Sequence, residues 1–430
     1  MSIKTKIIPI LQEVINGKYS NIVLNEFFSK NAFEEKERKF ITEIFYGVIR
    51  KKLFIDYIID QKTKSMKKDW IRNLLSISIY QITFMDSDDK GVVWEATELA
   101  KKKFGVSIGK FINGVLRSYI REKEEIIQNL KLERENIFLS YPKWFYDKIK
   151  EEYSDKYLHV LESMKKIPYM SFRVNKLKYT EEEFENLLKL LNINIIKKVD
   201  SVYYIGSGSL IHREEFKSGK IIVQDASSYL AAKNLSPSAG EVVLDACAAP
   251  GGKTAVIAEL MGNKGEITSL DIHQHKIKLI QENMKKLGVT IGLAVNLDAR
   301  KISMQGKKFD KILIDAPCSG YGVLRKKPET IYRKKIDNIK NLSQLQFEIL
   351  DSVSQSLKEN GVLVYSTCTI LTEENTDNIE KFLKKYPQYK VEKLEIPSNV
   401  AGTYDKYGGF LIDYNEDILD NFYIAKLRKK

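Results

Sequence analysis

The fold of the second half of the chain is decided by Val242-Val243-Leu244-Asp245-Ala246-Cys247-Ala248-Ala249-Pro250-Gly251-Gly252-Lys253-Thr254. A short apolar run ends in an acid and passes through a glycine turn into a segment that favours a helix. The glycines let the backbone approach a ligand closely, and the start of the helix offers unbonded N–H groups. The stretch therefore predicts a strand, a tight turn and a helix.

Short apolar runs alternate with helical patterns from about Gln224 onward. The runs are Val242–Asp245, Glu266–Asp271, Lys311–Asp315 and Val362–Thr367. Each ends in a polar residue, and three of them are followed within two residues by Pro or Cys. This alternation predicts a doubly wound parallel α/β sheet. Ligands in such sheets bind beyond the carboxyl ends of the strands, so we expect the chemistry there.

An acid follows the glycine turn at a spacing that indicates an adenosine cofactor. Asp271 ends the next expected strand, 20 residues after Gly251, and its carboxylate can accept both hydroxyls of a ribose. The turn has neither the Gly-x-Gly-x-x-Gly pattern of dehydrogenases nor the spacing of a P-loop, so a cofactor without a pyrophosphate fits better. Asp298 follows another expected strand, and it either contacts the adenine amino group or caps a turn.

Two cysteines follow neighbouring strands at this edge of the expected sheet. Cys318 lies in Asp-Ala-Pro-Cys-Ser-Gly, which begins at Asp315, and Cys368 lies in Tyr-Ser-Thr-Cys-Thr. A lone cysteine is usually a small buried apolar residue, but two at a ligand-binding edge favour covalent catalysis. A thiolate that adds to carbon 6 of cytosine makes carbon 5 able to accept a methyl group. Cys247 lies inside the cofactor turn, and we interpret it as structural.

This chemistry needs an acid and a base besides the thiolate. Asp315 is placed to stabilise the charge that develops at ring N3. A base must then remove the proton from carbon 5, and Cys318 or a water that it orders can assist.

Three motifs in this order closely resemble those of the RNA 5-methylcytosine methyltransferases of the RsmB/NOL/NSUN type. They are Cys-Ala-Ala-Pro-Gly-Gly-Lys at 247–253, Asp-Ala-Pro-Cys-Ser-Gly at 315–320 and Tyr-Ser-Thr-Cys at 365–368. The resemblance extends over about 224–430 and includes 322–329 and 373–375. Near the C-terminus, Asp-Asn-Phe-Tyr at 420–423 departs from the Asp-Gly-Phe-Phe usual in the family.

The resemblance implies S-adenosyl-L-methionine as the cofactor. The residues implied to line its pocket are Cys247, Ala248, Ala249, Pro250, Gly251, Gly252, Lys253, Asp271, Asp298 and Asp315. It also implies Cys368 as the nucleophile and Cys318 as a residue that helps to release the product.

The first 120 or so residues show apolar residues at helical spacing and no strand pattern, so we expect a small helical bundle. The pattern alone fits a packing or dimerisation module as well as an RNA-binding bundle. The segments Phe40–Arg50 and Phe111–Arg117 resemble a NusB-type RNA-binding domain, although the start of the domain matches loosely. We expect a separate charged linking helix over 121–135 and then a short α+β region.

Together these patterns predict a multidomain chain. We expect an all-α NusB-like bundle over 1–125, a linker helix with a small α+β RNA-binding domain over 126–223, and a Rossmann-like methyltransferase domain over 224–430. This is the arrangement of the RsmB-type enzymes, whose substrate is small-subunit ribosomal RNA.

The net charge of +13 suggests a polyanionic partner, although a lysine-rich composition from an AT-rich genome gives the same sum. Residues 321–340 hold seven basic residues against two acids. We expect Arg325, Lys326 and Lys327 in this basic run, and Arg173 in the α+β region, to contact RNA.

Three cysteines are too few for a disulfide framework, and with four histidines they make a zinc site improbable. No apolar run approaches the roughly 20 residues that a membrane helix needs, and we find no signal peptide. We therefore expect a cytoplasmic monomer with neither metal nor membrane partner.

Three alternatives to a ribosomal RNA enzyme stay open at this point: an inactive RNA-binding or ribosome-assembly factor, a nicotinamide enzyme, and methylation of another RNA such as tRNA. The intact cysteines, glycine turn and strand-end acids speak against the first. The missing Gly-x-Gly-x-x-Gly and the paired cysteines speak against the second.

Overall fold

The computed structural model describes residues 2–63, 68–206 and 209–430. The chain divides into two compact units. The helical unit comprises residues 1–165 and 324–334, and the sheet unit comprises residues 166–323 and 335–430. The chain thus passes from the sheet unit into the helical unit and back again within one short segment.

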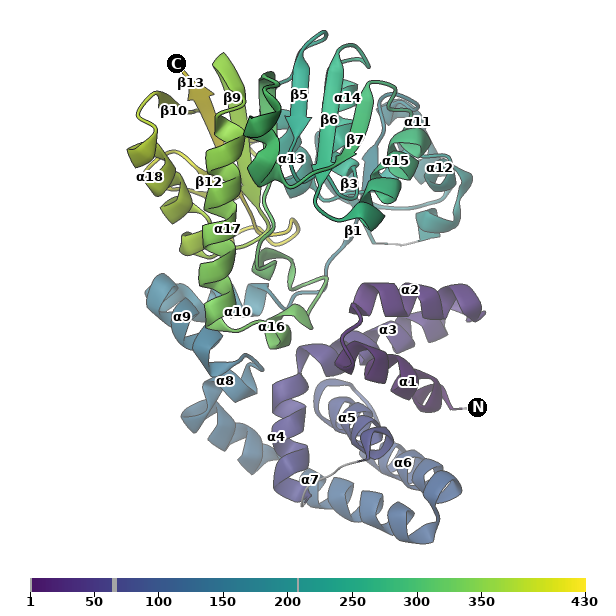
Figure 1. Cartoon of the computed structure of the whole chain (residues 1–430). Coiled ribbons are helices and arrows are strands. Elements are labelled where there is room, and N and C mark those ends of the chain that lie inside the picture. The colour runs from purple at the N-terminus through teal and green to yellow at the C-terminus, as the bar shows by residue number, and fades with distance from the viewer. Residues whose placement is uncertain (1, 64–67, 207–208) are drawn as a thin grey trace. The chain divides into compact units, whose positions relative to one another are not determined.

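The helical unit is built entirely from helices in its described part, as the sequence predicted (Figure 1). Its core is apolar, and α5 lies at the centre because Leu74, Leu75, Ile77 and Ile79 are all fully buried. Side-chain caps fix several helix starts, as where Asp88 accepts the amide of Gly91 at 2.9 Å. The helices are α1 (Ile3–Ile15), α2 (Ser20–Lys30), α3 (Glu35–Arg50), α4 (Lys52–Lys62), α5 (Asp69–Phe84), α6 (Asp89–Phe104), α7 (Val106–Glu133), α8 (Glu135–Phe138), α9 (Lys143–Tyr153), α10 (Tyr157–Ser163) and α16 (Thr330–Arg333).

The linking helix expected over 121–135 is not a separate element. Helix α7 runs without interruption for 28 residues and includes most of this charged stretch. Neither Gly nor Pro occurs between Gly114 and Glu133, so the sequence contains nothing that would end the helix there.

The sheet unit begins with a small antiparallel sheet in the order β2-β3-β1-β4. The strands are β1 (Met170–Val174), β2 (Ile195–Val199), β3 (Val202–Ile205) and β4 (Ile221–Val223). Helix α11 (Glu181–Leu190) begins at a capping box of Thr180 and Glu183 and packs Phe184 and Leu188 against Phe172. This arrangement confirms the predicted small α+β region.

The larger sheet has nine strands in the order β11-β12-β13-β9-β8-β5-β6-β7, with β10 also paired to β13. The strands are β5 (Val242–Asp245), β6 (Glu266–Asp271), β7 (Gly292–Asn296), β8 (Phe309–Asp315), β9 (Leu357–Thr367), β10 (Tyr389–Glu392), β11 (Thr403–Tyr404), β12 (Phe410–Ile412) and β13 (Phe422–Lys429). Strands β5 to β9 pair parallel with one another, which confirms the Rossmann-like prediction. The C-terminal strands pair antiparallel, so the sheet is mixed and not wholly parallel as expected.

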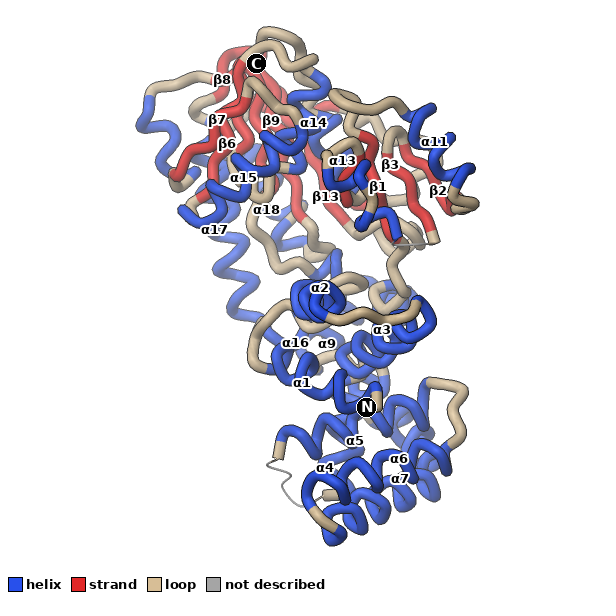
Figure 2. Tube along the Cα trace, turned by 90° about the vertical axis from the view of Figure 1, so that its right-hand side faces the viewer, coloured by secondary structure: helices blue, strands red, loops and turns tan. Residues whose placement is uncertain are grey.

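Helices cover both faces of this sheet (Figure 1; the strands are red in Figure 2). Side chains alternate between the faces along each strand: Val243 packs in the core that includes α14 (Gly252–Leu260), whereas Leu244 packs in the core that includes α17 (Ile336–Ser354). Helix α13 (Ala226–Asn234) joins the first core and α18 (Thr376–Lys385) the second. Helix α15 (Gln274–Leu287) follows β6.

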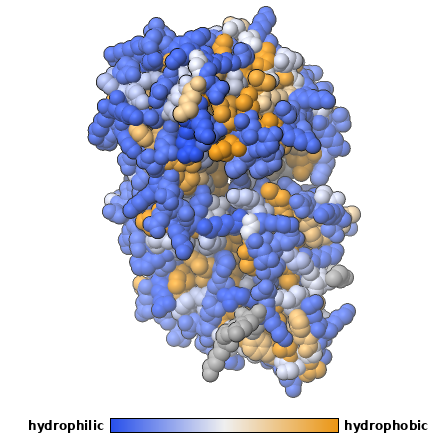
Figure 3. Space-filling model, viewed as in Figure 1, coloured by the Kyte–Doolittle hydropathy of each residue, from blue (hydrophilic) through white to orange (hydrophobic). Residues whose placement is uncertain are grey.

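Hydrophilic residues predominate on the face of the molecule seen in Figure 3. Within the ranges that the structure describes, we find no helix both long enough and apolar enough to cross a bilayer.

Candidate active site

The strand order places one crevice at the carboxyl ends of β5 and β8. Strands β6 and β7 lie to one side of β5, and β8 and β9 lie to the other. Helices that follow β5 and β8 therefore leave in opposite directions, and ligands of open α/β sheets bind at such a switch point. Asp245 and Asp315 end these two strands, and Cys368 directly follows β9.

A cavity of about 230 Å³ lies in this crevice. Gly251 has a φ of +103° at the start of α14, a conformation that glycine adopts without strain. The residues lining the cavity are Val223, Gln224, Asp225, Ser228, Asp245, Cys247, Ala248, Ala249, Pro250, Gly252, Lys253 and Asp315. The structure thus brings most of the predicted cofactor turn together with Asp315.

The segment from Val223 to Ser228 lines the cavity but was not among the predicted site residues. Asp225 caps α13 and accepts the amides of Ser227 at 3.1 Å and Asp420 at 3.2 Å. A usable signal was present, because Gln224 and Asp225 follow an apolar run and precede a helix. The same pattern identified the other strand ends.

Asp245 presents a buried acceptor to the cavity. Its side chain is fully buried, and Oδ2 accepts the Thr254 hydroxyl at 2.7 Å. Oδ1 is buried without a hydrogen-bond partner in the described part of the chain. Burial raises the pKa of this carboxyl to about 6. A bound ligand that carries a cation or an N–H donor would satisfy this oxygen, so the cavity fits the sulfonium and ammonium chemistry of the expected cofactor.

Asp315 is held by two neighbours at the other side of the cavity. Its Oδ2 lies 2.5 Å from the ammonium of Lys253, and its Oδ1 accepts the Ser366 hydroxyl at 3.1 Å. Lys253 is mostly buried, so this ion pair is shielded from solvent. The pair places a proton donor and a carboxylate together beside the cavity.

The two predicted catalytic cysteines are neighbours. Their Sγ atoms lie 2.9 Å apart, and the Cys368 amide donates to the Cys318 sulfur at 3.3 Å. The two cysteines are not joined in a disulfide. The shared hydrogen bond, burial and the nearby charges of Glu374 and Asp315 raise the pKa of Cys318 well above its ordinary value. Cys318 therefore keeps its proton at neutral pH and can donate it toward Cys368.

A buried glutamate fixes the loop that carries Cys318. Glu374 Oε2 accepts the Ser319 amide at 2.8 Å and the Gln346 side-chain amide at 2.8 Å. The sequence resemblance included this glutamate without assigning it a role.

Cys247 lies in the cofactor turn, away from this pair in sequence, and burial raises the pKa of its thiol. A protonated thiol is a poor nucleophile, which agrees with the structural interpretation of this residue.

Asp271 and Asp298 lie at the ends of β6 and β7. Asp271 is buried, accepts the His273 amide at 2.9 Å and lies 3.5 Å from the Lys276 ammonium. Asp298 caps the following turn through the Arg300 amide and pairs with the Arg300 guanidinium at 2.7 Å. The capping interpretation of Asp298 is therefore realised, and its contact with adenine stays a prediction.

The structure corrects two of the four residues expected to contact RNA. Arg173 is fully buried, pairs with Glu259 and also donates to Gln224. Arg325 is 1% exposed and donates to the Ser163 carbonyl at 2.9 Å. Neither guanidinium is open to phosphate in this structure, because both are held in the interior by protein acceptors.

Lys326 and Lys327 are half-buried, and Lys327 lies over the ring of Tyr19 at 5.5 Å. Their contact with RNA stays a prediction.

Over the described ranges, no group of three or more His, Cys, Asp or Glu side chains is arranged to hold a metal ion.

Family models match three successive parts of the chain. Residues 1–121 match the NusB family, and residues 141–201 match the ferredoxin-like domain of RsmF/B-like methyltransferases. Residues 232–428 match the 16S rRNA methyltransferase RsmB/F.

Similar proteins match most of the chain. The chain is 36% identical to a probable ribosomal RNA small subunit methyltransferase B of Bacillus subtilis, with 96% of each chain covered. It is 32% identical to the ribosomal RNA small subunit methyltransferase B of Vibrio cholerae, covering 94% of this chain and 92% of the other. A solved methyltransferase homologue from Pyrococcus horikoshii is 29% identical over 69% of this chain and 97% of its own, with a TM-score of 0.62.

Proposed function

This chain belongs to the RsmB/F family of 16S rRNA methyltransferases, and from that premise we propose that it methylates carbon 5 of a cytosine in small-subunit ribosomal RNA. The observation that carries the proposal is the pair of thiols at Cys318 and Cys368, 2.9 Å apart. Cys318 follows β8, which borders the crevice, and Cys368 follows the neighbouring strand β9. One cysteine suffices as the nucleophile. Release of the methylated base also needs a group that moves a proton, and the second cysteine can serve in that step.

S-Adenosyl-L-methionine supplies the methyl group. We assign its binding to the turn 247–253, Asp245 and Asp271. The unpartnered Oδ1 of Asp245 and the glycine backbone of the turn support this assignment. Gln224 and Asp225, which line the same cavity, complete the set of residues that orient it.

Cys368 is the nucleophile in this mechanism. The raised pKa of Cys318 keeps the proton on that thiol, and Cys318 can donate it toward the Cys368 sulfur 2.9 Å away. The Cys368 sulfur forms a bond to carbon 6 of the cytosine, and the electron pair of the 5,6 double bond moves toward carbon 5 and ring N3. The pair of Asp315 and Lys253, in which the ammonium donates to Oδ2 at 2.5 Å, hydrogen-bonds N3 and stabilises the charge there.

Once carbon 5 carries the methyl group, elimination of Cys368 from carbon 6 releases the product. Once the Cys368 sulfur is bonded to carbon 6, it accepts less well from Cys318, and the largest cause of the raised pKa of Cys318 is removed. Cys318, or a water that it orders, then takes the proton from carbon 5. The electrons of that C–H bond restore the 5,6 double bond, and Cys368 leaves as a thiolate.

We assign RNA recruitment to the NusB-like helical unit and place the enzyme in the cytoplasm as a monomer. The basic balance of the chain, 70 Lys and Arg against 57 Asp and Glu, supports a polyanionic substrate.

The proposed reaction is tested by incubating the purified chain with methyl-labelled cofactor and ribosomal RNA, followed by digestion to nucleosides. We expect label in 5-methylcytidine, and we expect Cys368→Ala to abolish it. Label in another nucleoside would refute the proposed position. RNA binding without any label would favour an inactive assembly factor, and label on tRNA alone would change the substrate.

A further inference from the structure

The segment Leu324–Lys334, which we call the clasp, is an excursion of the chain into the helical unit. The chain leaves the sheet unit after Val323 and returns at Lys335. Cys318 precedes the clasp by only six residues. The residues that hold the clasp can therefore influence the position of the loop that carries Cys318.

Glu329 makes the central contact of the clasp. It is 3% exposed, and its two carboxylate oxygens accept the Ser20 amide at 2.8 Å and the Ser20 hydroxyl at 2.7 Å. Ser20 is itself fully buried and begins the 11-residue helix α2. A carboxylate at a helix N-terminus is stabilised both by the free amide and by the helix dipole.

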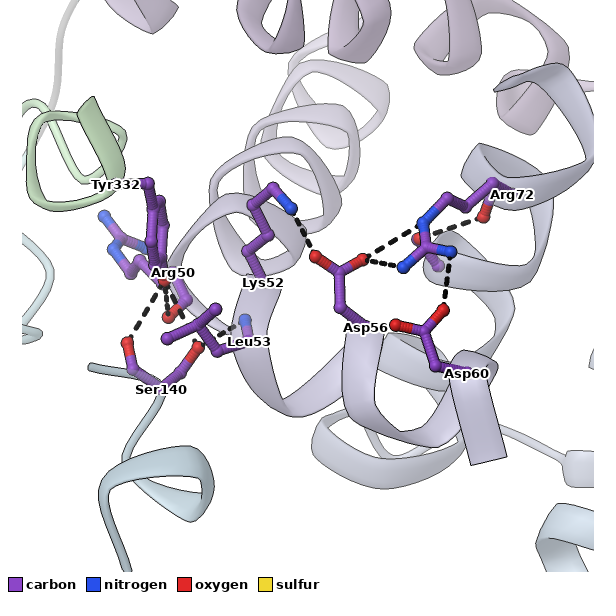
Figure 4. Close-up of polar contacts among 9 residues, drawn as sticks. Arg50, Lys52, Leu53, Asp56, Asp60, Arg72, Ser140 and Tyr332 are labelled. Atoms are coloured by element: carbon purple, nitrogen blue, oxygen red, sulfur yellow. Dashed lines mark hydrogen bonds and ion pairs between the residues drawn. The ribbon is translucent and has the colours of Figure 1, made fainter. Parts of the chain in front are cut away.

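Several further contacts of the clasp are with backbone groups of the helical unit. Arg333 donates to the carbonyls of Val14 at 3.1 Å and Lys18 at 2.5 Å, at the end of α1. The Tyr332 hydroxyl lies 3.2 Å from the carbonyls of Arg50 and Ser140 (Figure 4). Backbone partners cannot change rotamer, so each contact fixes the clasp at a defined position.

The start of the clasp is fixed in the same way. The Arg325 carbonyl accepts from the Arg50 guanidinium at 3.2 Å, and the Arg325 side chain donates to Ser163. In the sheet unit, the Gly322 amide donates to the Cys368 carbonyl at 2.9 Å, and the Gly322 carbonyl accepts the Asn421 amide at 3.2 Å. Only Val323 and Leu324 separate these two fixed points, and a residue spans at most about 3.6 Å.

Directed hydrogen bonds hold this segment beside an unfilled space. Glu329, Tyr332 and Arg333 line a cavity of about 260 Å³ together with Val14, Ile49 and other residues of the helical unit. Burying a charged carboxylate beside a cavity contributes little net stability, but it selects one geometry. The clasp is thus suited to fix the position of the preceding loop, which carries Cys318.

We propose that the helical unit positions Cys318 through the clasp, and that Glu329 is a positioning residue for the methylation reaction. The inference rests on the role of Cys318 in the proposed function. Loss of the Glu329 contact leaves the clasp held only by its remaining contacts, so the stretch of chain from 318 to 325 is held less firmly and the Cys318 thiol shifts relative to Cys368. The helical unit then does more than recruit RNA, because it also holds half of the catalytic thiol pair.

The test measures Cys318 directly in the full-length chain, without RNA or cofactor. Iodoacetamide alkylation of Cys318 and Cys247 is followed by peptide mass spectrometry in the parent, Glu329→Gln, Ser20→Ala and Ser20→Thr. A glutamine offers one acceptor oxygen in place of two, so we expect the Cys318 rate to rise at least about threefold in Glu329→Gln. Ser20→Thr keeps the hydroxyl and should match the parent, and Glu26→Gln on the exposed face of α2 is the matched control.

Kinetics provide the second measurement. A catalytic group displaced by about 1 Å costs up to roughly a hundredfold in rate, so we expect kcat to fall about tenfold in Glu329→Gln. The KM for RNA should stay within about twofold of the parent, because the clasp contact is buried. The kcat of the double variant Ser20→Ala/Glu329→Gln should be no lower than that of Glu329→Gln alone, since both substitutions weaken the same contact.

The two proposals fail separately. An unchanged Cys318 rate in both Glu329→Gln and Ser20→Ala overturns the clasp, whether or not the chain methylates RNA. A Cys318 response in a chain that methylates no cytosine supports the clasp and refutes the function. An equal rise in the Cys247 alkylation rate would reveal that Glu329→Gln unfolds. In that case the milder variant Ser20→Ala decides. A faster rate at Cys318 alone supports the positioning role, and a faster rate at both cysteines or at neither overturns it.

Discussion

The Cys318 and Cys368 thiols share one hydrogen bond, yet their removal should have opposite consequences. Cys368→Ala lacks the nucleophile, so it should form no adduct and no product. Cys318→Ala should still attack and methylate but release slowly, and it should accumulate as a protein–RNA conjugate. The physical reason is that blocking the second half of a covalent reaction exposes the intermediate of the first. Denaturing gel electrophoresis with labelled RNA measures the conjugate.

The double variant Cys318→Ala/Cys368→Ala is the control for this experiment, since its conjugate should disappear. A stable conjugate with Cys368→Ala and none with Cys318→Ala would exchange the two roles. Full activity of Cys368→Ala without any conjugate would refute the covalent mechanism.

Asp245 should make cofactor affinity depend on pH. Burial raises the pKa of its carboxyl to about 6, and a ligand that donates to Oδ1 binds the ionised form. Binding therefore releases a proton below this pKa, so affinity should fall about tenfold per pH unit below pH 6 and become constant well above it. Calorimetry between pH 5 and 8 measures the effect.

Asp245→Asn carries no titrating group at this position. It should bind the cofactor weakly, with an affinity that does not change with pH. Asp298→Asn should keep the pH dependence of the parent. A parent profile that stays flat down to pH 5 would show that Asp245 does not contact the cofactor.

Asp271 is expected to hold the cofactor through its ribose. A hydrogen bond to a charged group contributes about 1.5–3 kcal/mol, so Asp271→Ala should weaken cofactor binding at least about tenfold. Calorimetry without RNA measures this affinity. Lys276→Ala removes the cation nearest to Asp271 but leaves the carboxylate, so it distinguishes loss of the acceptor from loss of the ion pair. Equal affinity in Asp271→Ala and the parent would contradict the ribose assignment.

At the scale of elements, the sequence predicted best where a local signal ends a strand. The bounds of β5 and β6 agree with the predicted runs, because an apolar segment stops at Asp245 and Asp271. The antiparallel strands β10 to β13 were not predicted, since strand direction depends on which neighbour a segment meets. Burial of Arg173 and Arg325 was also beyond sequence reasoning, because their acceptors, Glu259 and Ser163, are remote in the chain.

The clasp also contains Lys326 and Lys327, which are expected to contact RNA. Replacing Lys326 and Lys327 by Ala should reduce the slope of log affinity against log salt by up to about two, if both side chains meet phosphate. Filter binding with ribosomal RNA over a range of salt concentrations measures the slope. The pair Lys384→Ala/Lys385→Ala, on exposed residues of α18, is the matched control. Identical slopes in all three proteins would make Lys326 and Lys327 residues of a solvated face.

For the whole molecule, the fold class followed from composition and motif, but the division of the chain did not. A contiguous N-terminal domain was expected, whereas the helical unit also takes in the clasp. The contacts responsible join residues some 300 positions apart, such as Ser20 and Glu329. Such pairs leave no periodic signal in one sequence, because each residue is locally unremarkable as a helix cap or a surface acid.

This division determines what removal of the first 120 residues should do. Every residue that lines the cofactor cavity lies between Val223 and Asp315, so a chain beginning at Arg121 should bind the cofactor within about threefold of the parent affinity. It should methylate ribosomal RNA poorly for two reasons: it loses the RNA-recruiting helices and the Ser20 contact that holds Glu329. Calorimetry and methyl-label incorporation measure these effects.

Glu329→Gln in the full-length chain separates the two causes. It should reduce kcat but keep the parent's salt-dependent RNA affinity, since the recruiting helices are intact. The shortened chain should lose both. If it kept full selectivity and rate on ribosomal RNA, residues 1–120 would serve neither recruitment nor positioning. If its RNA affinity were unchanged but its rate fell to that of Glu329→Gln, the helices would act on catalysis through the clasp alone.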